Sequence, residues 1–169
     1  MKYPKYLALV IVAITMSACS NTSGPFGANR NGTASGELGQ YGSPSDPTSP
    51  AHFQEILGDR IFFLVDDATL TLAAQNTLNR QAEWLNNNLD YRAVIEGHAD
   101  ERGTREYNLA LGARRANATL EYLLARGVPE SRLQTISYGK ERPIEICSDE
   151  SCYSVNRRAV TLLETGLSG

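Results

Sequence analysis

The chain has 169 residues, of which 41% are hydrophobic and 21% are charged, and its formal net charge is −3 at pH 7. This length fits one modest globular domain with flanking segments. Because there is no basic excess to displace counterions from phosphates, the charge excludes a general nucleic-acid binder.

The first residues are typical of a secretory signal peptide. Lys2 and Lys5 precede an apolar run over residues 7–14, which is too short to span a bilayer comfortably as a permanent helix. Residues 16–19, Met-Ser-Ala-Cys, resemble a bacterial lipobox with methionine where leucine is usual. We therefore expect a lipoprotein signal peptide at 1–18, and a lipidated Cys19 that tethers the protein to a membrane on the periplasmic side. The alternative is ordinary signal cleavage that leaves a free thiol.

The segment that follows is predicted to be a linker. Residues 19–51 comprise the lipidated N-terminus and a stretch dominated by Gly, Ser, Pro, Asn and Thr. Such a stretch lacks the apolar side chains that would offset the entropy of ordering, so we expect a flexible spacer with no binding role. Ser20, rather than aspartate, follows Cys19, which is compatible with export to the outer membrane.

A folded domain is predicted over residues 52–169, beginning with a strand and a helix. The apolar run 61–65 is of strand type, and residues 66–69, Asp-Asp-Ala-Thr, indicate a turn. Apolar residues then recur at steps of three and four, which is the stripe of an amphipathic helix. The residues of this stripe are Ala74, Leu78, Ala82, Leu85 and Leu89.

A second strand and a longer helix come next. Residues 92–98 carry β-branched Val94 and Ile95 at their centre, which favours a strand. The helix has Thr104 as its predicted N-cap and ends at Arg126-Gly127. Strands at 134–138 and 158–163 complete the domain. The order strand, helix, strand, helix, strand, strand predicts an α/β sandwich with the helices packed on one sheet face.

Several ordered motifs resemble one known family. They are IEGHADERGTREYNLALGARRA at 95–116, ISYGKERP at 136–143 and NRRAV at 156–160. Over residues 58–163 the chain resembles the OmpA-like peptidoglycan-binding domain. The resemblance implies an α+β fold of βαβαββ order, with two main helices on one face of a mixed four-stranded sheet, preceded by a disordered tether.

The resemblance also implies a function and partners. The expected activity is non-covalent binding of peptidoglycan through the diaminopimelate residue of an uncrosslinked stem peptide, without catalysis and without a cofactor. This would anchor the outer membrane to the cell wall within the Tol envelope machinery, which supports envelope integrity and cell division, with TolB as a periplasmic partner.

The family's ligand residues map onto particular positions of this sequence. Asp100 and Arg115 carry over as the main ligand contacts, and Asn108 and Leu111 line the same site. Arg157 carries over to the rim of the site, together with its neighbours at 156 and 158. The first strand of the family commonly reads Phe-Asp-Phe-Asp. Here the second aspartate is kept as Asp66 but a leucine stands at 64, which puts a contact from that position in doubt.

The helix geometry is compatible with a shared site. Asn108, Leu111 and Arg115 lie at i, i+3 and i+7 and so share a helix face. We expect Asp100 to meet the ammonium group of diaminopimelate and Arg115 to meet its carboxylate, because a guanidinium can bind a carboxylate with two parallel hydrogen bonds. The simpler alternative is that Asp100 caps a turn and Arg115 forms a surface ion pair.

The rival hypothesis is a metal-dependent enzyme or a peptidoglycan hydrolase. His98, Asp100 and Glu101 suggest such a site, but the chain has only one other histidine, His52, at the end of the linker. No zinc-protease motif, nucleophile elbow or phosphate-binding loop is present. We therefore predict no metal site, and we expect His98 to be a hydrogen-bonded structural residue. A stator or porin with the same domain would need a membrane-spanning helix or barrel that this sequence lacks.

Two cysteines remain besides Cys19. Cys147 and Cys152 are five residues apart in a polar segment, and the expected compartment is oxidising. We predict a disulfide between them that contributes roughly 2 kcal/mol. Their spacing is not that of a redox-active C-x-x-C pair.

Overall fold

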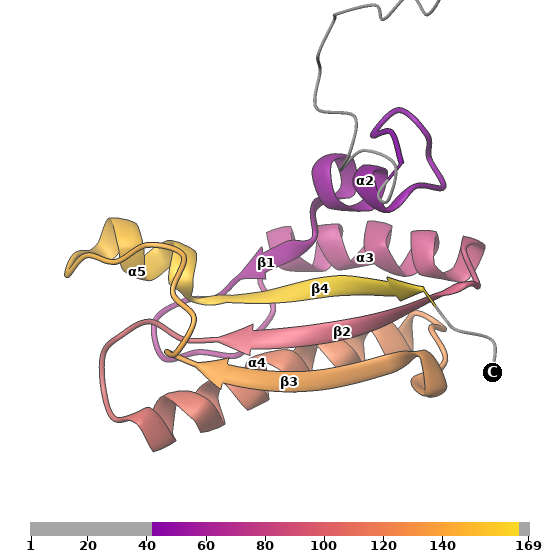
Figure 1. The fold of residues 1–169 in the computed structure, drawn as a ribbon. Helices are drawn as coiled ribbons and strands as arrows, with labels where there is room; N and C mark the ends of the chain where they lie inside the picture. The colour runs from indigo at the N-terminus through magenta and orange to yellow at the C-terminus, as the bar shows by residue number, and fades with distance from the viewer. Residues whose placement is uncertain (1–41, 166–169) are drawn as a thin grey trace, which may run out of the picture. The chain divides into compact units, whose positions relative to one another are not determined.

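The computed structural model describes residues 42–165, and the positions of the predicted signal peptide and of Cys19 lie outside this range. Figure 1 shows the order of the elements along the chain. They are α2 (Pro50–His52), the π-helical turn η1 (Phe53–Gly58), β1 (Arg60–Phe62), α3 (Leu72–Asn87), β2 (Tyr91–His98), α4 (Arg105–Ala125), the 3-10 turn η2 (Glu130–Arg132), β3 (Leu133–Gly139), α5 (Glu150–Asn156) and β4 (Arg158–Thr165).

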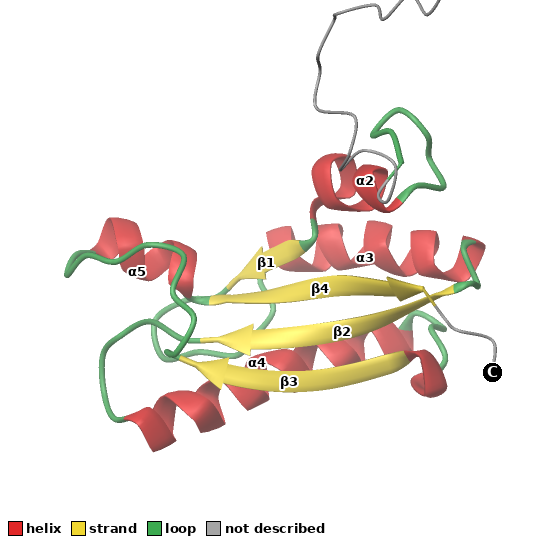
Figure 2. Ribbon diagram, viewed as in Figure 1, coloured by secondary structure: helices red, strands yellow, loops and turns green. Residues whose placement is uncertain are grey.

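The four strands form one mixed sheet in the order β1-β4-β2-β3. β2 and β3 are parallel, whereas β4 is antiparallel to both β1 and β2. Helices α3 and α4 lie behind one face of this sheet (Figure 2). This arrangement confirms the predicted α+β fold with two main helices on one face of the sheet.

The core lies between the sheet and the two helices. The predicted helical stripe supplies Leu78 and Leu85, and α4 supplies Leu123; all three side chains are fully buried, as is Ile95 from β2. Burying a side chain of this size contributes about 1.5–3 kcal/mol relative to leaving it exposed. Leu89 is the exception, since α3 ends at Asn87 and this leucine is exposed.

The ends of α4 follow the sequence signals. The Thr104 hydroxyl accepts a hydrogen bond from the Tyr107 backbone N–H. At the other end Gly127 has a positive φ, and the N–H groups of Gly127 and Val128 donate to the carbonyls of Leu124 and Leu123. These two bonds form a Schellman motif, which satisfies carbonyls that the helix itself leaves without partners.

Two glycines let α4 approach β2 closely. A Cβ atom built on Gly97 would lie 1.9 Å from the carbonyl oxygen of Gly112, and one built on Gly112 would lie 2.5 Å from the Ser137 hydroxyl. Any side chain at these positions would push the helix away from the sheet. This contact therefore sets the distance between α4 and the strands β2 and β3.

The first strand is shorter than its apolar run suggests. β1 ends at Phe62, and Leu64 and Val65 are exposed in the following loop. Pairing with β4 ends at Phe62 and Arg158, and Asp66, in the loop beyond, has a positive φ of 55°. The prediction of a strand over 61–65 was therefore wrong at its C-terminal end.

The segment directly before α2 is ordered against the domain. The Trp84 indole N–H donates to the Pro47 carbonyl at 2.7 Å, and the Ser49 hydroxyl caps α2. Phe53 is 1% exposed and packs edge-on against Trp84. Residues 42–51, which the sequence assigned to the linker, thus belong to the folded part because they cover an indole that would otherwise be exposed. Within residues 42–165, no helix is long and apolar enough to cross a membrane.

Candidate functional site

A pocket of about 300 Å³ lies where β1 and β2 end and α4 begins. Three segments line it: the loop after β1, the loop after β2 and the first turns of α4. The structure thereby brings together four of the residues predicted from the sequence, with four others. The lining residues are Val65, Asp66, Asp100, Arg102, Gly103, Tyr107, Asn108 and Leu111.

Asp100 is the most strongly held carboxylate in this pocket. Its oxygens accept hydrogen bonds from the Arg102 guanidinium at 2.6 and 3.3 Å and from the Arg102 backbone N–H at 3.2 Å. Arg157 adds a contact of 3.3 Å from behind. Burial of Asp100 raises its pKa, but the bonds from Arg102 and Arg157 outweigh burial and hold the pKa below its ordinary value. The carboxylate is therefore ionised at neutral pH.

Asp66 provides a second carboxylate at the pocket, and it is exposed. The Tyr107 hydroxyl donates a hydrogen bond to it across the pocket. This bond raises the pKa of Tyr107, because it favours the protonated phenol. Asp66 and Asp100 therefore border one cavity.

Asn108 and Leu111 form the α4 side of the pocket. Asn108 is 1% exposed, and its amide donates to the Arg102 carbonyl at 2.6 Å. This bond ties the loop after β2 to the helix. Leu111, at 4% exposure, gives the pocket an apolar wall.

Arg115 does not line the pocket but lies beneath it, fully buried. Its guanidinium donates to three backbone carbonyls: Leu64 at 3.0 Å, Asp67 at 2.8 Å and His98 at 2.8 Å. Burial lowers the pKa of Arg115 to about 10, so it remains charged at neutral pH. The side chain joins the two loops that border the pocket, and in this geometry it does not present a free fork to a ligand. The alternative considered from the sequence, a surface ion pair of Arg115, is also absent among the described residues.

The predicted rim residues lie behind Asp100. Arg157 donates to the Phe63 carbonyl at 3.2 Å and also contacts Glu150. Asn156 accepts from the backbone N–H of Ile144 at 2.7 Å and donates to the Glu145 carbonyl, so it holds the loop before α5. Arg158 extends this role, since it donates to the Arg142 carbonyl.

Sequence reasoning missed three residues that touch this constellation. Arg102 lies two residues after Asp100. An aspartate side chain often accepts a hydrogen bond from the backbone N–H two residues on, so this spacing could have indicated the contact. Tyr107 and Glu150 carried no such signal, because their partners Asp66 and Arg157 come from other parts of the chain. Long-range contacts of this kind have no local sequence pattern.

His98 is a buried residue and not a pocket residue. It is 1% exposed and stacks on Tyr138 with ring centroids 5.6 Å apart. Neither ring nitrogen has a hydrogen-bond partner among the described residues, although Nε2 lies 3.5 Å from a Glu96 oxygen. The expected hydrogen bond is thus absent there, and burial, followed by the charges of Arg158 and Arg142, lowers the pKa of His98 to about 3.

The two remaining thiols are joined in a disulfide, Cys147–Cys152, with their Cα atoms 5.8 Å apart. Within residues 42–165, these cysteines and Asp149 are the only group of three or more side chains positioned like metal ligands. Because the disulfide consumes both thiols, this group has no thiolate to offer a metal.

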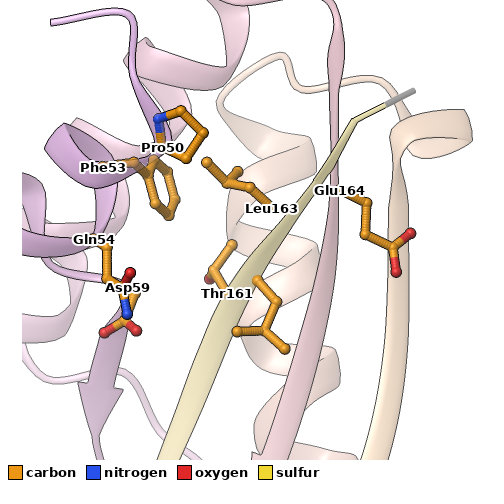
Figure 3. Close-up of a pocket in the computed structure, with 8 residues that line it drawn as sticks. Pro50, Phe53, Gln54, Asp59, Thr161, Leu163 and Glu164 are labelled. Atoms are coloured by element: carbon orange, nitrogen blue, oxygen red, sulfur yellow. The ribbon is translucent and has the colours of Figure 1, made fainter. Parts of the chain in front are cut away.

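A larger pocket, of about 500 Å³, lies at the other end of β1. Figure 3 shows Pro50 and Phe53 on one side of it and Thr161 and Leu163 of β4 on the other. None of the predicted site residues lines this pocket. Size alone therefore does not identify the candidate site; the paired carboxylates do.

A helix-backed mixed sheet with an acidic pocket at its strand ends defines a ligand-binding domain. Residues 62–157 match the OmpA family. The chain is 51% identical to the peptidoglycan-associated lipoprotein of Agrobacterium fabrum over 95% of this chain and 87% of that protein. It is 38% identical to the protein of the same name from Legionella pneumophila, over 92% of each. The chain therefore belongs to the OmpA family and, within it, with the peptidoglycan-associated lipoproteins, a non-catalytic class.

Solved structures agree with this assignment. The crystal structure of the peptidoglycan-associated lipoprotein from Burkholderia pseudomallei has a TM-score of 0.64 and 34% identity, covering 72% of this chain and all of that one. The C-terminal domain of Helicobacter pylori MotB has a TM-score of 0.60 at 20% identity, covering 64% of this chain and 86% of that one. At that identity the MotB likeness shows the fold alone.

Proposed function

We propose that this protein binds peptidoglycan non-covalently and anchors the outer membrane to the cell wall. The names of the relatives, which are peptidoglycan-associated lipoproteins, support the class of ligand. The observation that carries the proposal is the pair of carboxylates, Asp66 and Asp100, that border one small pocket. The proposed ligand is the diaminopimelate residue of an uncrosslinked stem peptide.

The pocket has a group for each end of this zwitterionic ligand. The ammonium group meets the carboxylates of Asp66 and Asp100. The ligand carboxylate meets Arg102, whose side chain is 44% exposed and is the one cation among the lining residues. Arg115 adds a positive charge from below and holds the loop that carries Asp66, in place of the direct contact expected from the sequence. Leu111 packs against the ligand's methylene groups.

The cellular setting is also a proposal. A lipid on Cys19 places the domain at the periplasmic side of the outer membrane, and the protein acts within the Tol-Pal system with TolB as a partner, supporting envelope integrity and cell division. Its relatives are named lipoproteins, which supports a lipid anchor. Replacing Cys19 by serine should release the protein from the membrane fraction, and a membrane-bound variant would contradict the anchor.

The decisive experiment is retention of the mature, unlipidated chain on purified sacculi. Asp100→Asn and Asp66→Asn should each weaken retention. The loss should be larger for buried Asp100, because removing a partner from a buried charge pair typically lowers affinity by about thirtyfold or more. Asp90→Asn is the matched control, because Asp90 is an exposed aspartate just before β2. Parental retention by both pocket variants would overturn the proposal, and release of soluble muropeptides would favour the hydrolase alternative.

A further inference from the structure

Glu150, in the first turn of α5, contacts both arginines that hold Asp100. Its carboxylate forms an ion pair with Arg157 and lies 3.9 Å from the guanidinium of Arg102. Arg102 and Arg157 in turn approach the same Asp100 oxygen, at 2.6 and 3.3 Å. The four side chains therefore form one alternating chain of charges behind the pocket.

The position of Glu150 depends on the loop that the disulfide closes. Cys147–Cys152 spans the first turn of α5, so it restrains residue 150 directly. The Tyr153 ring lies against the Arg102 guanidinium, 4.5 Å from its centre, and the Tyr153 hydroxyl lies 3.2 Å from a Glu101 oxygen. These contacts dock α5 onto the loop after β2.

The docking of α5 brings the negative charge of Glu150 to the two arginines that contact Asp100. Without Glu150, the single negative charge of Asp100 faces the two positive charges of Arg102 and Arg157, so this group of side chains has a net positive charge. With Glu150 present, two carboxylates share two guanidiniums, and Arg157 directs one terminal nitrogen to Asp100 and the other to Glu150. Asp100 then retains negative charge for a cationic ligand group.

We propose that Glu150, placed by the Cys147–Cys152 loop, is a positioning residue that sets the pocket's selectivity for an ammonium group, because it shares the positive charge of Arg157 and Arg102 with Asp100. This inference rests on the proposed function, since it names what controls ligand selection in that same pocket. Glu150 acts through the arginines, because it does not line the pocket.

The first test measures affinity of the mature chain for a soluble stem tripeptide that ends in diaminopimelate. Glu150→Gln should weaken binding by up to about fivefold, the range for a partly exposed ion pair. Binding of the tripeptide with its side-chain amine acetylated should not weaken. Glu145→Gln is the matched control, a nearby exposed glutamate, and should bind like the parent. Equal tripeptide affinity of Glu150→Gln and the parent would overturn the proposal.

A second arm tests the disulfide. The double variant Cys147→Ser, Cys152→Ser should also weaken tripeptide binding, and adding Glu150→Gln should cause little further loss, because both changes act on one contact. Fully additive losses would contradict the positioning role.

A third readout is independent of ligand. Removing the negative charge of Glu150 should lower the pKa of the Asp100 carboxyl, measured by carbon NMR titration, because repulsion falls and Arg157 is released. If the parent does not bind the tripeptide, the proposed function fails, and this titration still decides the role of Glu150. An unchanged Asp100 pKa in Glu150→Gln would overturn the inference.

Discussion

Arg115 shows how a buried cation can be stabilised without a carboxylate partner in direct contact. Its guanidinium has N–H donors in a rigid fork, and three of them meet carbonyls from two separate loops. An arginine in this setting links segments that are far apart in sequence through its hydrogen bonds. Although Arg115 is buried, its replacement should affect ligand binding, because Arg115 holds the loop that carries Asp66.

Arg115→Ala should unfold more easily than the parent. Three carbonyls lose their partners, but only the hydrogen bond to His98 is fully buried. At roughly 0.5–1.5 kcal/mol for each hydrogen bond, the free energy of unfolding should fall by about 2–4 kcal/mol. Arg115→Lys should recover little, because one ammonium group cannot span the three acceptors. Denaturant titration measures the effect, and the exposed neighbour Arg114→Ala is the control. Equal stability of the two alanine variants would contradict this role.

His98 should make the domain's stability depend on pH. Its folded pKa of about 3 lies below the ordinary value of 6.5, because burial and then Arg158 and Arg142 disfavour the charged ring. Between these values the unfolded chain binds a proton that the folded domain does not. The stabilisation is therefore fully present above pH 6.5 and falls on acidification, with a slope approaching about 1.4 kcal/mol per pH unit.

The measurement compares stability at pH 7 and pH 5 in the parent and in His98→Asn. The variant should show the smaller decrease, since its neutral amide does not titrate. All other titratable groups are the same in both proteins, so the difference isolates His98. Parallel curves for the two proteins would argue against a depressed His98 pKa.

At the level of elements, the contact between α4 and β2 tolerates no side chain. Gly97→Ala would place a methyl group 1.9 Å from the Gly112 carbonyl oxygen. Relieving this clash requires the backbone of α4 or of β2 to move, which is costly. We expect a loss of about 3 kcal/mol or complete failure to fold. Ala110→Ser, at an exposed position of α4, should have a small effect. Thermal unfolding distinguishes them, and a parental melting temperature for Gly97→Ala would contradict the close contact.

The sequence predicted these elements where the signals were local. The Thr104 cap and the Gly127 stop of α4 both act within a few residues, and both are present in the structure. The end of β1 and the helix α5 were not predicted, because β1 ends where its pairing with β4 ends and α5 begins inside a disulfide-closed loop. Local patterns do not encode such constraints.

The candidate site was predictable only through the family resemblance. Asp66 and Asp100 are far apart in the chain, and no spacing rule brings them to one pocket. The resemblance also assigned a direct ligand contact to Arg115, whereas its hydrogen bonds to three carbonyls emerge only from the folded loops. Burial of this kind is a tertiary property.

At the level of the whole molecule, the folded part begins before the expected boundary at residue 52. Deleting residues 24–40 should leave the melting temperature unchanged, because this stretch is rich in Gly, Ser, Asn and Thr and has few apolar side chains to bury. Extending the deletion to residue 50 removes the Pro47 carbonyl that accepts from Trp84 and the Ser49 cap. A loss of about 1 kcal/mol would lower the melting temperature by roughly 4 °C or less. Calorimetry of the two deletions tests this, and identical transitions would contradict a structural role for residues 42–50.

The placement of β1 has a mechanical consequence. The described chain begins at residue 42, ahead of α2 and β1 (Figure 1), whereas the pocket residues Val65 and Asp66 follow the end of β1. If a lipid on Cys19 anchors the protein and the pocket holds the cell wall, as proposed, tension between the two attachments passes along β1. The hydrogen bonds from β1 to β4 lie across the strand, from Asp59–Thr161 to Phe63–Arg157, so force along β1 loads them together in shear and does not open them one at a time. The proposed attachment therefore loads the shortest strand of the described sheet along its own axis.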